Sequence, residues 1–552
     1  MKAIFFVIFV VLSSNLSAQN TLKITYLKQN NGQVIPNQDP VVVFTNANQT
    51  VLSTEKNLLN KGAYPMENTL INRSDFSYIL SAQFKDGTSV KTKDSLSIAQ
   101  QNFTLFDEVR KIKGYTCKKA QTVINSNTIE LWYTSDLKVA GSPTVLGQKL
   151  GLVLEVIRNG SVWLTVESIE KVIVLPSLLS VFKSPAPLVD LLTYRDELFQ
   201  HRFTTIPIFK QVKLAEKQDS TQSDLRYFTN ESIVLKKVKF PKIASSSQVF
   251  ISVNEQSSGD AYDRTGSVFI VPMKKAQSFL DGLEKGVATL PIYTNGNGKE
   301  YQGVVTTSTF DPLIELVRFF TPFGVGQYNT IQIKGKKWAE SVDYRQDISD
   351  LSSELSEQEV YIGFTVFGKH TVSVNVTIHE EEGVVASEKK VVPLFNTLNV
   401  MEFAGQNYGT MFSNEEGLKV EFNLEKPIKN AKLRYITTGH GGWENGDEFV
   451  PKKNSLYLDN SLVHAFYPWR QDCGAFRNSN PASGNFGNGL SSSDYSRSNW
   501  CPGTATNPVY IDLGDLQSGL HTIHVKIPLG PTEGNSFSAW NVSGCIIGEE
   551  QK

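Results

Sequence analysis

The stretch Thr371-Val372-Ser373-Val374-Asn375-Val376-Thr377-Ile378 alternates between polar and apolar side chains. Successive side chains of a β-strand point to opposite faces of a sheet, so this period of two predicts a half-buried strand. Ile233 to Phe240 and Val249 to Val253 alternate in the same way, and Val268 to Val271 is a continuous apolar run. We therefore expect an antiparallel β-sandwich over residues 226–388.

A second group of strand-like segments follows in the last third of the chain. The segments that alternate or run apolar are Leu418 to Asn423, Ala431 to Ile436, Val509 to Leu513 and Thr522 to Ile527. They predict a second sandwich over residues 389–552. The expected fold class is all-β, with two consecutive antiparallel β-sandwiches of the jelly-roll type.

The first part of the chain is expected to form a separate β-rich accessory domain. At roughly 150 residues per domain, 552 residues correspond to about three or four domains. Short β-type runs such as Ile129 to Tyr133 place this domain at residues 19–172. Prolines interrupt the following stretch, so we expect a structured linker over residues 173–225, with a short helix over Leu188 to Phe199.

The N-terminus has the pattern of a secretory signal peptide. Lys2 precedes an apolar run from Ile4 to Leu12, and small and polar residues lead to Ala18. The alternative is a short membrane anchor, but the run is too short to cross a bilayer about 30 Å thick. We therefore expect residues 1–18 to be removed and the protein to be periplasmic or secreted. Disulfides persist in that compartment. We expect no segment of the mature chain to span a membrane.

The charge balance gives no reason to expect two classes of partner. Lys plus Arg total 54 and Asp plus Glu total 55, a net charge of −1. Without a basic excess, the chain has no electrostatic reason to bind nucleic acid or acidic lipid.

Two loops of the second predicted sandwich combine glycines, aromatic rings and charged groups. Thr437 to Phe449 contains Gly442, Trp443 and Glu448, and Arg497 to Gly503 contains Trp500. Aromatic rings can cover the apolar face of a pyranose while neighbouring polar groups bind its hydroxyls. The residues alone leave a carbohydrate site and simple loop packing as about equal alternatives.

These loops carry a resemblance to a known family. Arg497-Ser498-Asn499-Trp500-Cys501-Pro502-Gly503, Asp260-Ala261-Tyr262-Asp263-Arg264 and Arg318 to Gly326 occur in the family's order. Over roughly residues 228–550 the chain resembles the peptide-N-glycosidase F family, bacterial amidases that remove asparagine-linked glycans. Gly114 to Ala120 and nearby strands are similar to GLPGLI-type secreted domains, which imply no chemistry.

The resemblance implies roles for particular residues. Asp263 matches the principal catalytic carboxylate and Glu448 the second one. The implied substrate-binding residues are Arg264, Arg497, Gly442 and Trp443, and we expect Trp500 of the aromatic loops to bind substrate as well. Together with the oxidising compartment, the resemblance also implies a disulfide between Cys473 and Cys501.

The implied activity is hydrolysis of the bond between N-glycan GlcNAc and asparagine in N-linked glycoproteins or glycopeptides. Amide hydrolysis needs an activated water and a proton for the departing nitrogen, and two carboxylates with different pKa values can supply both. We expect no cofactor, no catalytic metal and a monomer.

Two other functions remain open from the sequence. The family has a third acidic residue on a late strand of its first sandwich, whereas Tyr361 to Phe367 contains no acid. This departure favours a non-catalytic N-glycan-binding protein on the same fold. Copper monooxygenases also use tandem sandwiches, but His521 and His524 would face opposite sides of a strand.

Overall fold

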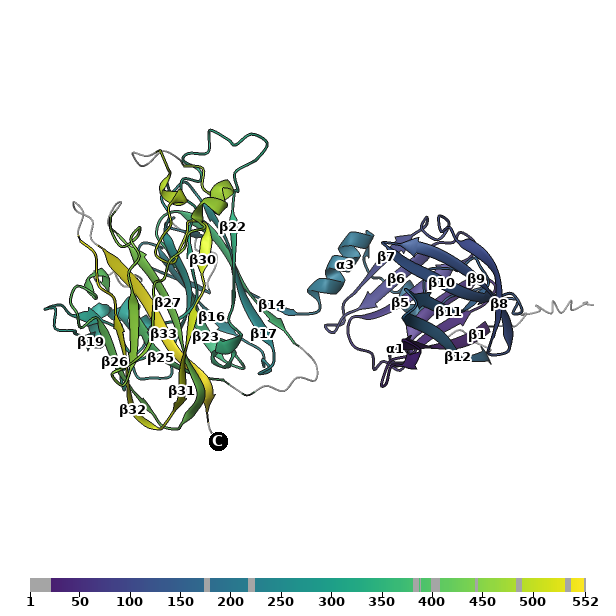
Figure 1. Cartoon of the computed structure of the whole chain (residues 1–552), viewed down its shortest axis with the longest axis horizontal. Coiled ribbons are helices and arrows are strands. Elements are labelled where there is room, and N and C mark those ends of the chain that lie inside the picture. The colour runs from purple at the N-terminus through teal and green to yellow at the C-terminus, as the bar shows by residue number, and fades with distance from the viewer. Residues whose placement is uncertain are drawn as a thin grey trace, which may run out of the picture. The chain divides into compact units, whose positions relative to one another are not determined.

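The computed structural model describes residues 21–172, 179–216, 224–380, 387, 389–398, 408–441, 445–482, 489–531 and 538–550. The chain divides into two compact units, residues 1–202 and 203–552 (Figure 1). Both units consist mainly of antiparallel strands, which confirms the all-β prediction. The predicted signal peptide lies outside the described residues and stays a prediction.

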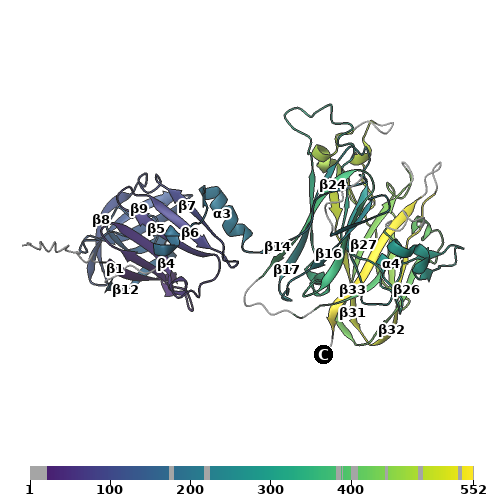
Figure 2. The ribbon, with the colours of Figure 1, turned by 180° about the vertical axis from the view of Figure 1, so that it is seen from behind.

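Unit 1 is built on one large sheet, visible from both sides in Figures 1 and 2. Its strands are β1 (Thr21–Asn30), β2 (Gln33–Val34), β3 (Val41–Thr45), β4 (Gln49–Thr54), β5 (Met66–Asn72), β6 (Tyr78–Gln83), β7 (Ser89–Asp94), β8 (Thr104–Ile112), β9 (Tyr115–Ile124), β10 (Asn127–Thr134), β11 (Leu152–Arg158), β12 (Val162–Val172) and β13 (Leu188–Val189). They follow the order β13-β7-β6-β5-β4-β3-β1-β12-β11-β10-β9-β8, with β2 paired to β1. Ile24, Val43 and Leu154 belong to its core.

The helices of unit 1 are short: α1 (Glu55–Leu58), α2 (Leu179–Lys183) and α3 (Leu191–Gln200). The carboxylate of Asp190 caps α3 by accepting hydrogen bonds from the amides of Leu192 and Thr193. Tyr194 of α3 is buried against Phe84, which follows β6, so this helix is part of unit 1.

The linker expected over residues 173–225 is therefore corrected. Part of it belongs to unit 1, and Thr204–Leu214 forms β14, which pairs with β24 of unit 2. Phe209, Val212 and Leu214 of β14 are buried in the first sandwich. Two register shifts interrupt the pairing of β14 with β24, so buried and exposed side chains do not alternate regularly along this strand.

The first sandwich of unit 2 consists of two sheets, in the orders β14-β24-β17-β22 and β15-β16-β23-β18-β21-β30. Its further strands are β15 (Leu225–Phe228), β16 (Ile233–Lys239), β17 (Gln248–Ser257), β18 (Thr265–Val271), β21 (Ile314–Phe320), β22 (Val342–Asp347), β23 (Glu359–Val366), β24 (His370–His379) and β30 (Thr504–Thr506). β24 alternates buried and half-buried side chains throughout, as its sequence predicts.

The second sandwich has the sheets β25-β33-β27-β31 and β26-β32-β28-β29. Its strands are β25 (Lys389–Asn396), β26 (Leu418–Leu424), β27 (Ile428–His440), β28 (Asn454–Leu458), β29 (Ser461–Phe466), β31 (Val509–Leu516), β32 (Gly519–Lys526) and β33 (Ala539–Glu550). The remaining elements of unit 2 are the hairpin β19 (Ile292–Tyr293) and β20 (Tyr301–Gln302), α4 (Phe279–Lys285), and the 3₁₀ helices η1 (Val287–Thr289), η2 (Ser349–Glu354), η4 (Tyr408–Thr410), η5 (Cys473–Ser479) and η6 (Ser492–Asp494).

The two sandwiches are joined by a shared strand and a shared core. β30 comes late in the chain but pairs with β21 of the first sandwich, with Thr506 opposite Arg318. Phe269 of the first sandwich and Leu433 of the second lie in one hydrophobic cluster. Loops from both sandwiches are thereby held at fixed positions relative to each other, which is what a composite site requires.

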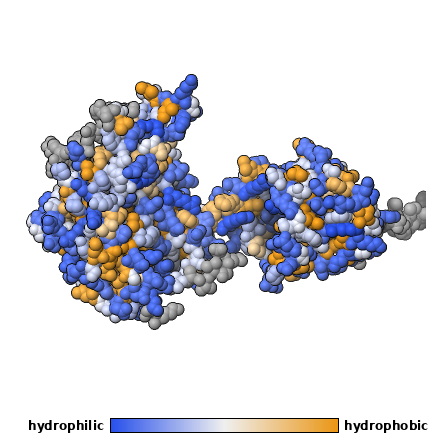
Figure 3. Space-filling model, in the orientation of Figure 1, coloured by the Kyte–Doolittle hydropathy of each residue, from blue (hydrophilic) through white to orange (hydrophobic). Residues whose placement is uncertain are grey.

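The face of the molecule that Figure 3 shows is mostly polar. Figure 3 shows apolar residues scattered among hydrophilic ones on the face in view. No helix among the described residues is both long and apolar enough to cross a membrane.

Candidate functional site

Asp263 and Arg264 immediately precede β18 of the first sandwich. The backbone of Arg264 is held on both sides by Thr321: its amide donates to Thr321 Oγ1 at 2.8 Å, and its carbonyl accepts from the Thr321 amide at 2.9 Å. The side chain of Arg264 pairs with Asp260, with Nε at 2.9 Å from Oδ2. Asp260 thus orients Arg264, while the Asp263 carboxylate stays available for another partner.

Glu448 lies in the loop that follows β27 of the second sandwich. Its amide donates to the carbonyl of Gly441 at 3.3 Å, and its carbonyl accepts from the amide of Ser498 at 3.0 Å. The preceding residue, Asp447, is fully buried and accepts a hydrogen bond from Trp540 Nε1 at 2.8 Å. These bonds fix the backbone of Glu448 although it belongs to a loop.

Arg497 brings the two carboxylates together. Its Nη1 lies 3.0 Å from Asp263 Oδ2 and also pairs with Glu448 Oε1. Its Nη2 donates to both the carbonyl and the hydroxyl oxygen of Ser492 in η6, each at 2.6 Å. Arg497 has no exposed surface. One guanidinium therefore faces one carboxylate from each sandwich.

Burial dominates the protonation of this pair. The side chains of Asp263 and Glu448 are only 15% and 18% exposed. Loss of hydration raises the pKa of Glu448 to about 7; the Arg497 charge opposes this rise and the Asp263 charge adds to it. Burial likewise raises the pKa of Asp263, against the opposing charges of Arg497 and Arg264. Two carboxyl groups sharing one guanidinium can therefore retain a proton near neutral pH.

Trp500 packs beneath Arg497. The guanidinium lies 4.2 Å from the centre of a Trp500 ring, and Phe320 stacks on the indole at 4.1 Å. The indole nitrogen donates to the carbonyl of Gly439 at 2.9 Å, and the side chain is only 2% exposed. With both faces covered, the ring cannot offer one to a sugar. This corrects the expectation that Trp500 contacts substrate and makes it a support for Arg497.

The other predicted substrate-binding residues have different outcomes. Arg264 lies between the rings of Tyr262 and Phe367, 5.0 Å from each centre, and Tyr262 is exposed. Gly442 and Trp443 lie outside the described residues, so their roles stay predictions.

The predicted disulfide between Cys473 and Cys501 is confirmed, with a Cα–Cα distance of 5.1 Å. The amide and carbonyl of Arg497 form a pair of backbone hydrogen bonds with Arg470, at 2.8 and 2.9 Å. The disulfide and these bonds together hold the arginine's loop. Cys117 in unit 1 and Cys545 in unit 2 are buried thiols.

Sequence reasoning missed two supporting residues. Ser492 binds the Arg497 side chain although it lies in a serine-rich loop with no recognisable motif. His440 lies beside Trp500, with ring centres 5.4 Å apart, and burial together with the charges of Arg318 and Arg497 lowers its pKa to about 3. A neutral imidazole therefore borders the site. No sequence pattern indicated this position, because His440 is a lone histidine.

Among the described residues, no group of three or more His, Cys, Asp and Glu side chains could hold a metal ion.

Comparisons with known proteins agree with this architecture. Residues 205–378 match the family model "Peptide-N-glycosidase F, N terminal", and residues 407–547 match "Peptide-N-glycosidase F, C terminal". Residues 24–196 match "N-glycanase peptide, N-terminal domain". The resemblance of this region to GLPGLI-type domains stays a prediction.

Solved structures extend the match to nearly the whole chain. Two crystal forms of PNGF-II, in space groups C2 and P21, are each 50% identical to this chain and cover 97% of it. The match spans 99% and 100% of those chains, with TM-scores of 0.89 and 0.91. PNGase F, described as a glycosylasparaginase from Flavobacterium meningosepticum, matches 63% of this chain and 96% of its own at 16% identity and a TM-score of 0.42. No curated protein matches the chain. The chain belongs to the peptide-N-glycosidase F family.

Proposed function

We propose that this protein is an exported, metal-independent amidase that hydrolyses the bond between N-glycan GlcNAc and the asparagine side chain. The observation that carries the proposal is the Arg497 guanidinium, which faces Asp263 from the first sandwich and Glu448 from the second. Family membership adds an N-glycanase activity and glycoprotein substrates.

In this proposal Asp263 acts as the base. Arg497 opposes the rise in its pKa and so keeps the ionised form accessible. The carboxylate takes a proton from water, and the resulting hydroxide adds to the amide carbon of the substrate. Glu448, whose pKa is raised to about 7, supplies a proton to the departing nitrogen as the carbon–nitrogen bond breaks.

The products follow from this bond cleavage. The peptide keeps a new carboxyl group, so asparagine becomes aspartate, and the glycan leaves as a glycosylamine. A second water converts the glycosylamine to ammonia and a glycan with a free reducing end. The two carboxyl groups together lose and regain one proton, so the enzyme is unchanged after the cycle.

The test is mass spectrometry of a denatured N-glycoprotein after incubation with the purified protein. We expect the mass change from asparagine to aspartate at glycosylated positions and intact glycans in solution. Glu448→Gln, which keeps the shape and removes the titrating group, should be severely impaired. Glycans that remain attached after prolonged incubation would instead favour the non-catalytic N-glycan-binding protein. The absence of an acid in Tyr361–Phe367 is the sequence feature that supports this alternative.

A further inference from the structure

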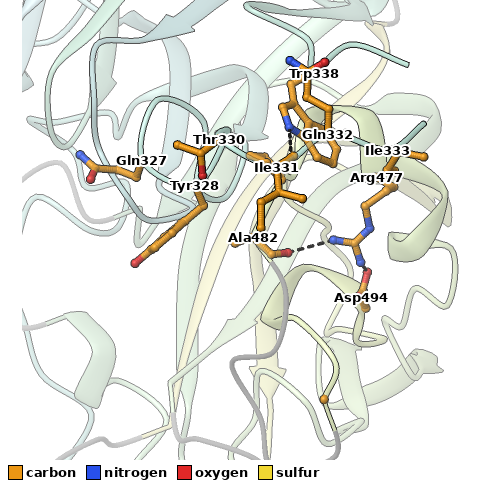
Figure 4. Close-up of a pocket in the computed structure, with 12 residues that line it drawn as sticks. Gln327, Tyr328, Thr330, Ile331, Gln332, Ile333, Trp338, Arg477, Ala482 and Asp494 are labelled. Atoms are coloured by element: carbon orange, nitrogen blue, oxygen red, sulfur yellow. Dashed lines mark hydrogen bonds and ion pairs between the residues drawn. The ribbon is translucent and has the colours of Figure 1, made fainter. Parts of the chain in front are cut away.

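We propose that the cavity between the β21–β22 loop and the helices η5 and η6 binds sugars of the N-glycan beyond the one attached to asparagine. This loop cavity has a volume of about 720 Å³ (Figure 4). Residues that line it include Gln327, Tyr328, Ile331, Trp338, Arg477 and Asp494. The inference rests on the proposed function and names a binding region for its substrate.

The loop cavity borders the segments that carry the catalytic groups. On one side, the side-chain amide of Gln327 donates to the carbonyl of Gly259, next to the Asp260 that orients Arg264. On the other side, Asp494 ends η6, whose first residue, Ser492, binds Arg497. A substrate held at Asp263 and Glu448 can therefore extend from the catalytic groups toward the loop cavity.

The polar groups of the loop cavity are held in place by other parts of the protein. Arg477 pairs with Asp494 and donates from Nη1 to the carbonyls of Asn480 and Ala482, at 3.0 and 2.9 Å. Asp494 also accepts from the amide of Ser491 at 3.1 Å. Donors and acceptors that are positioned before binding can recognise hydroxyl groups at little cost in entropy.

Aromatic and aliphatic groups face the same space (Figure 4). The indole nitrogen of Trp338 donates to the carbonyl of Ile331 at 2.8 Å, which fixes the ring within its loop. Tyr328 is 52% exposed and Ile331 is 80% exposed. An exposed tyrosine ring and a half-buried indole beside fixed polar groups suit the alternating apolar and hydroxylated surfaces of pyranoses. The volume is within the range of about 300–1,000 Å³ that is usual for small-molecule sites.

The architecture favours a glycan over the polypeptide part of the substrate. Extended peptides are commonly bound by pairing with an exposed strand edge. The described residues that line the loop cavity lie in loops and 3₁₀ helices, and none of them belongs to a strand. Recognition there has to depend on side chains, as it does for sugars.

The experiment compares two substrates with the same peptide, one carrying chitobiose and the other a trimannosyl-chitobiose core. The full chain is assayed as wild type, Tyr328→Ala and Trp338→Ala. Leu462→Ala is the control, because Leu462 is 56% exposed on β29 and does not line the loop cavity. We expect each aromatic variant to raise KM for the longer glycan about tenfold, an effect of about 1.4 kcal/mol, while kcat and the chitobiose reaction stay unchanged.

Equal losses on both substrates, or no loss on either, would overturn the proposal. A loss that depends on peptide length at constant glycan would assign the loop cavity to the polypeptide and overturn it as well. Calorimetric binding of free trimannosyl-chitobiose separates this proposal from the catalytic one, because it needs no turnover. If the wild type binds this sugar and Tyr328→Ala does not, the loop cavity is supported even when no glycan is released; equal binding by both refutes it.

Discussion

Arg318 and Arg497 are buried arginines that connect the sandwiches of unit 2, and their surroundings differ. Arg318 and Arg497 both have no exposed surface. Arg318 forms a two-pronged pair with Glu315 of the same strand, at 3.0 and 2.7 Å, and donates to Thr438 and to the carbonyl of Asn541 in the second sandwich. Each nitrogen of the Arg318 guanidinium thus has a hydrogen-bond partner within the protein.

The carboxylate at Arg318 is also fully bonded. Glu315 accepts from Ser267 and Ser543 in addition to Arg318, at 2.9 and 2.6 Å. Burial acts to raise its pKa, but the Arg318 charge and these hydrogen bonds outweigh burial and leave the pKa below its usual value. This carboxylate is stably ionised, which suits a structural ion pair.

Arg497 differs because two carboxylates share it and their pKa values are raised. Within the described part of the chain, its buried Nε has no hydrogen-bond partner, nor has Asp263 Oδ2, which meets Arg497 only as an ion pair. An incompletely satisfied ion cluster thus distinguishes the proposed catalytic site from a structural ion pair of similar burial.

The strongest test of this distinction is Asp263→Asn. The variant keeps the size of the side chain and removes the base, so kcat should fall by about 10²–10⁴, or about 3–5 kcal/mol in the barrier, while the fold is retained. Glycopeptide hydrolysis measures the rate and circular dichroism the fold. Deglycosylation at a nearly wild-type rate would show that Asp263 is not the base.

The converse test is Arg318→Met. Removal of this cation leaves the buried Glu315 charge without its partner and should lower the free energy of unfolding by about 3–5 kcal/mol. Denaturant unfolding measures the loss. As a matched control, Glu315→Leu combined with Arg318→Met removes both charges and should recover part of the stability. Two variants of equal stability would mean that the uncompensated charge is not the cause.

The Cys473–Cys501 disulfide restrains the loop of Arg497, whereas Arg318 lies in a paired strand and needs no such restraint. Replacement of both cysteines by serine should lower stability by about 3–4 kcal/mol according to chain-entropy arithmetic. Thermal unfolding with and without reductant provides the measurement. If wild type and variant melt together under oxidising conditions, the bond does not contribute as expected.

A smaller effect concerns pH. The pKa of Glu448 is about 7 in the folded protein and about 4.5 in the unfolded chain, so the folded state holds the extra proton between these values. Its contribution to stability is complete below pH 4.5 and is lost as pH rises through 7, up to about 3 kcal/mol. Unfolding at pH 5 and pH 8 should show a smaller loss for Glu448→Gln than for wild type, because the variant lacks the titration of Glu448. Equal losses in both proteins would contradict the raised pKa.

The smallest expected effect is that of removing unit 1, because both arginines lie in unit 2. A fragment of residues 203–552 keeps β14 intact and should cleave a small glycopeptide at a rate close to that of the full chain. If unit 1 orients bulky substrates, the fragment should lose activity on intact glycoproteins. A folded fragment that is inactive on the small glycopeptide would place unit 1 in the catalytic machinery.

Local patterns were sufficient to predict the strands and the carboxylates. Period-two alternation predicted β24, because a strand sends successive side chains to opposite faces. The motifs around Asp263 and Arg497 indicated the family and the expected catalytic groups. β14 was missed because its two register shifts break the alternation.

Only the tertiary structure decided what these residues touch. Arg264 follows Asp263 in the chain but pairs with Asp260, whereas Arg497, from a distant loop, is the cation that faces Asp263 and Glu448. The aromatic ring of Trp500 and its polar neighbours predicted a sugar contact, but Phe320 and Arg497 cover the faces of this ring. Which charges meet and which rings are covered depends on how the two sandwiches pack, and burial, which raises the carboxyl pKa values, arises only from that packing.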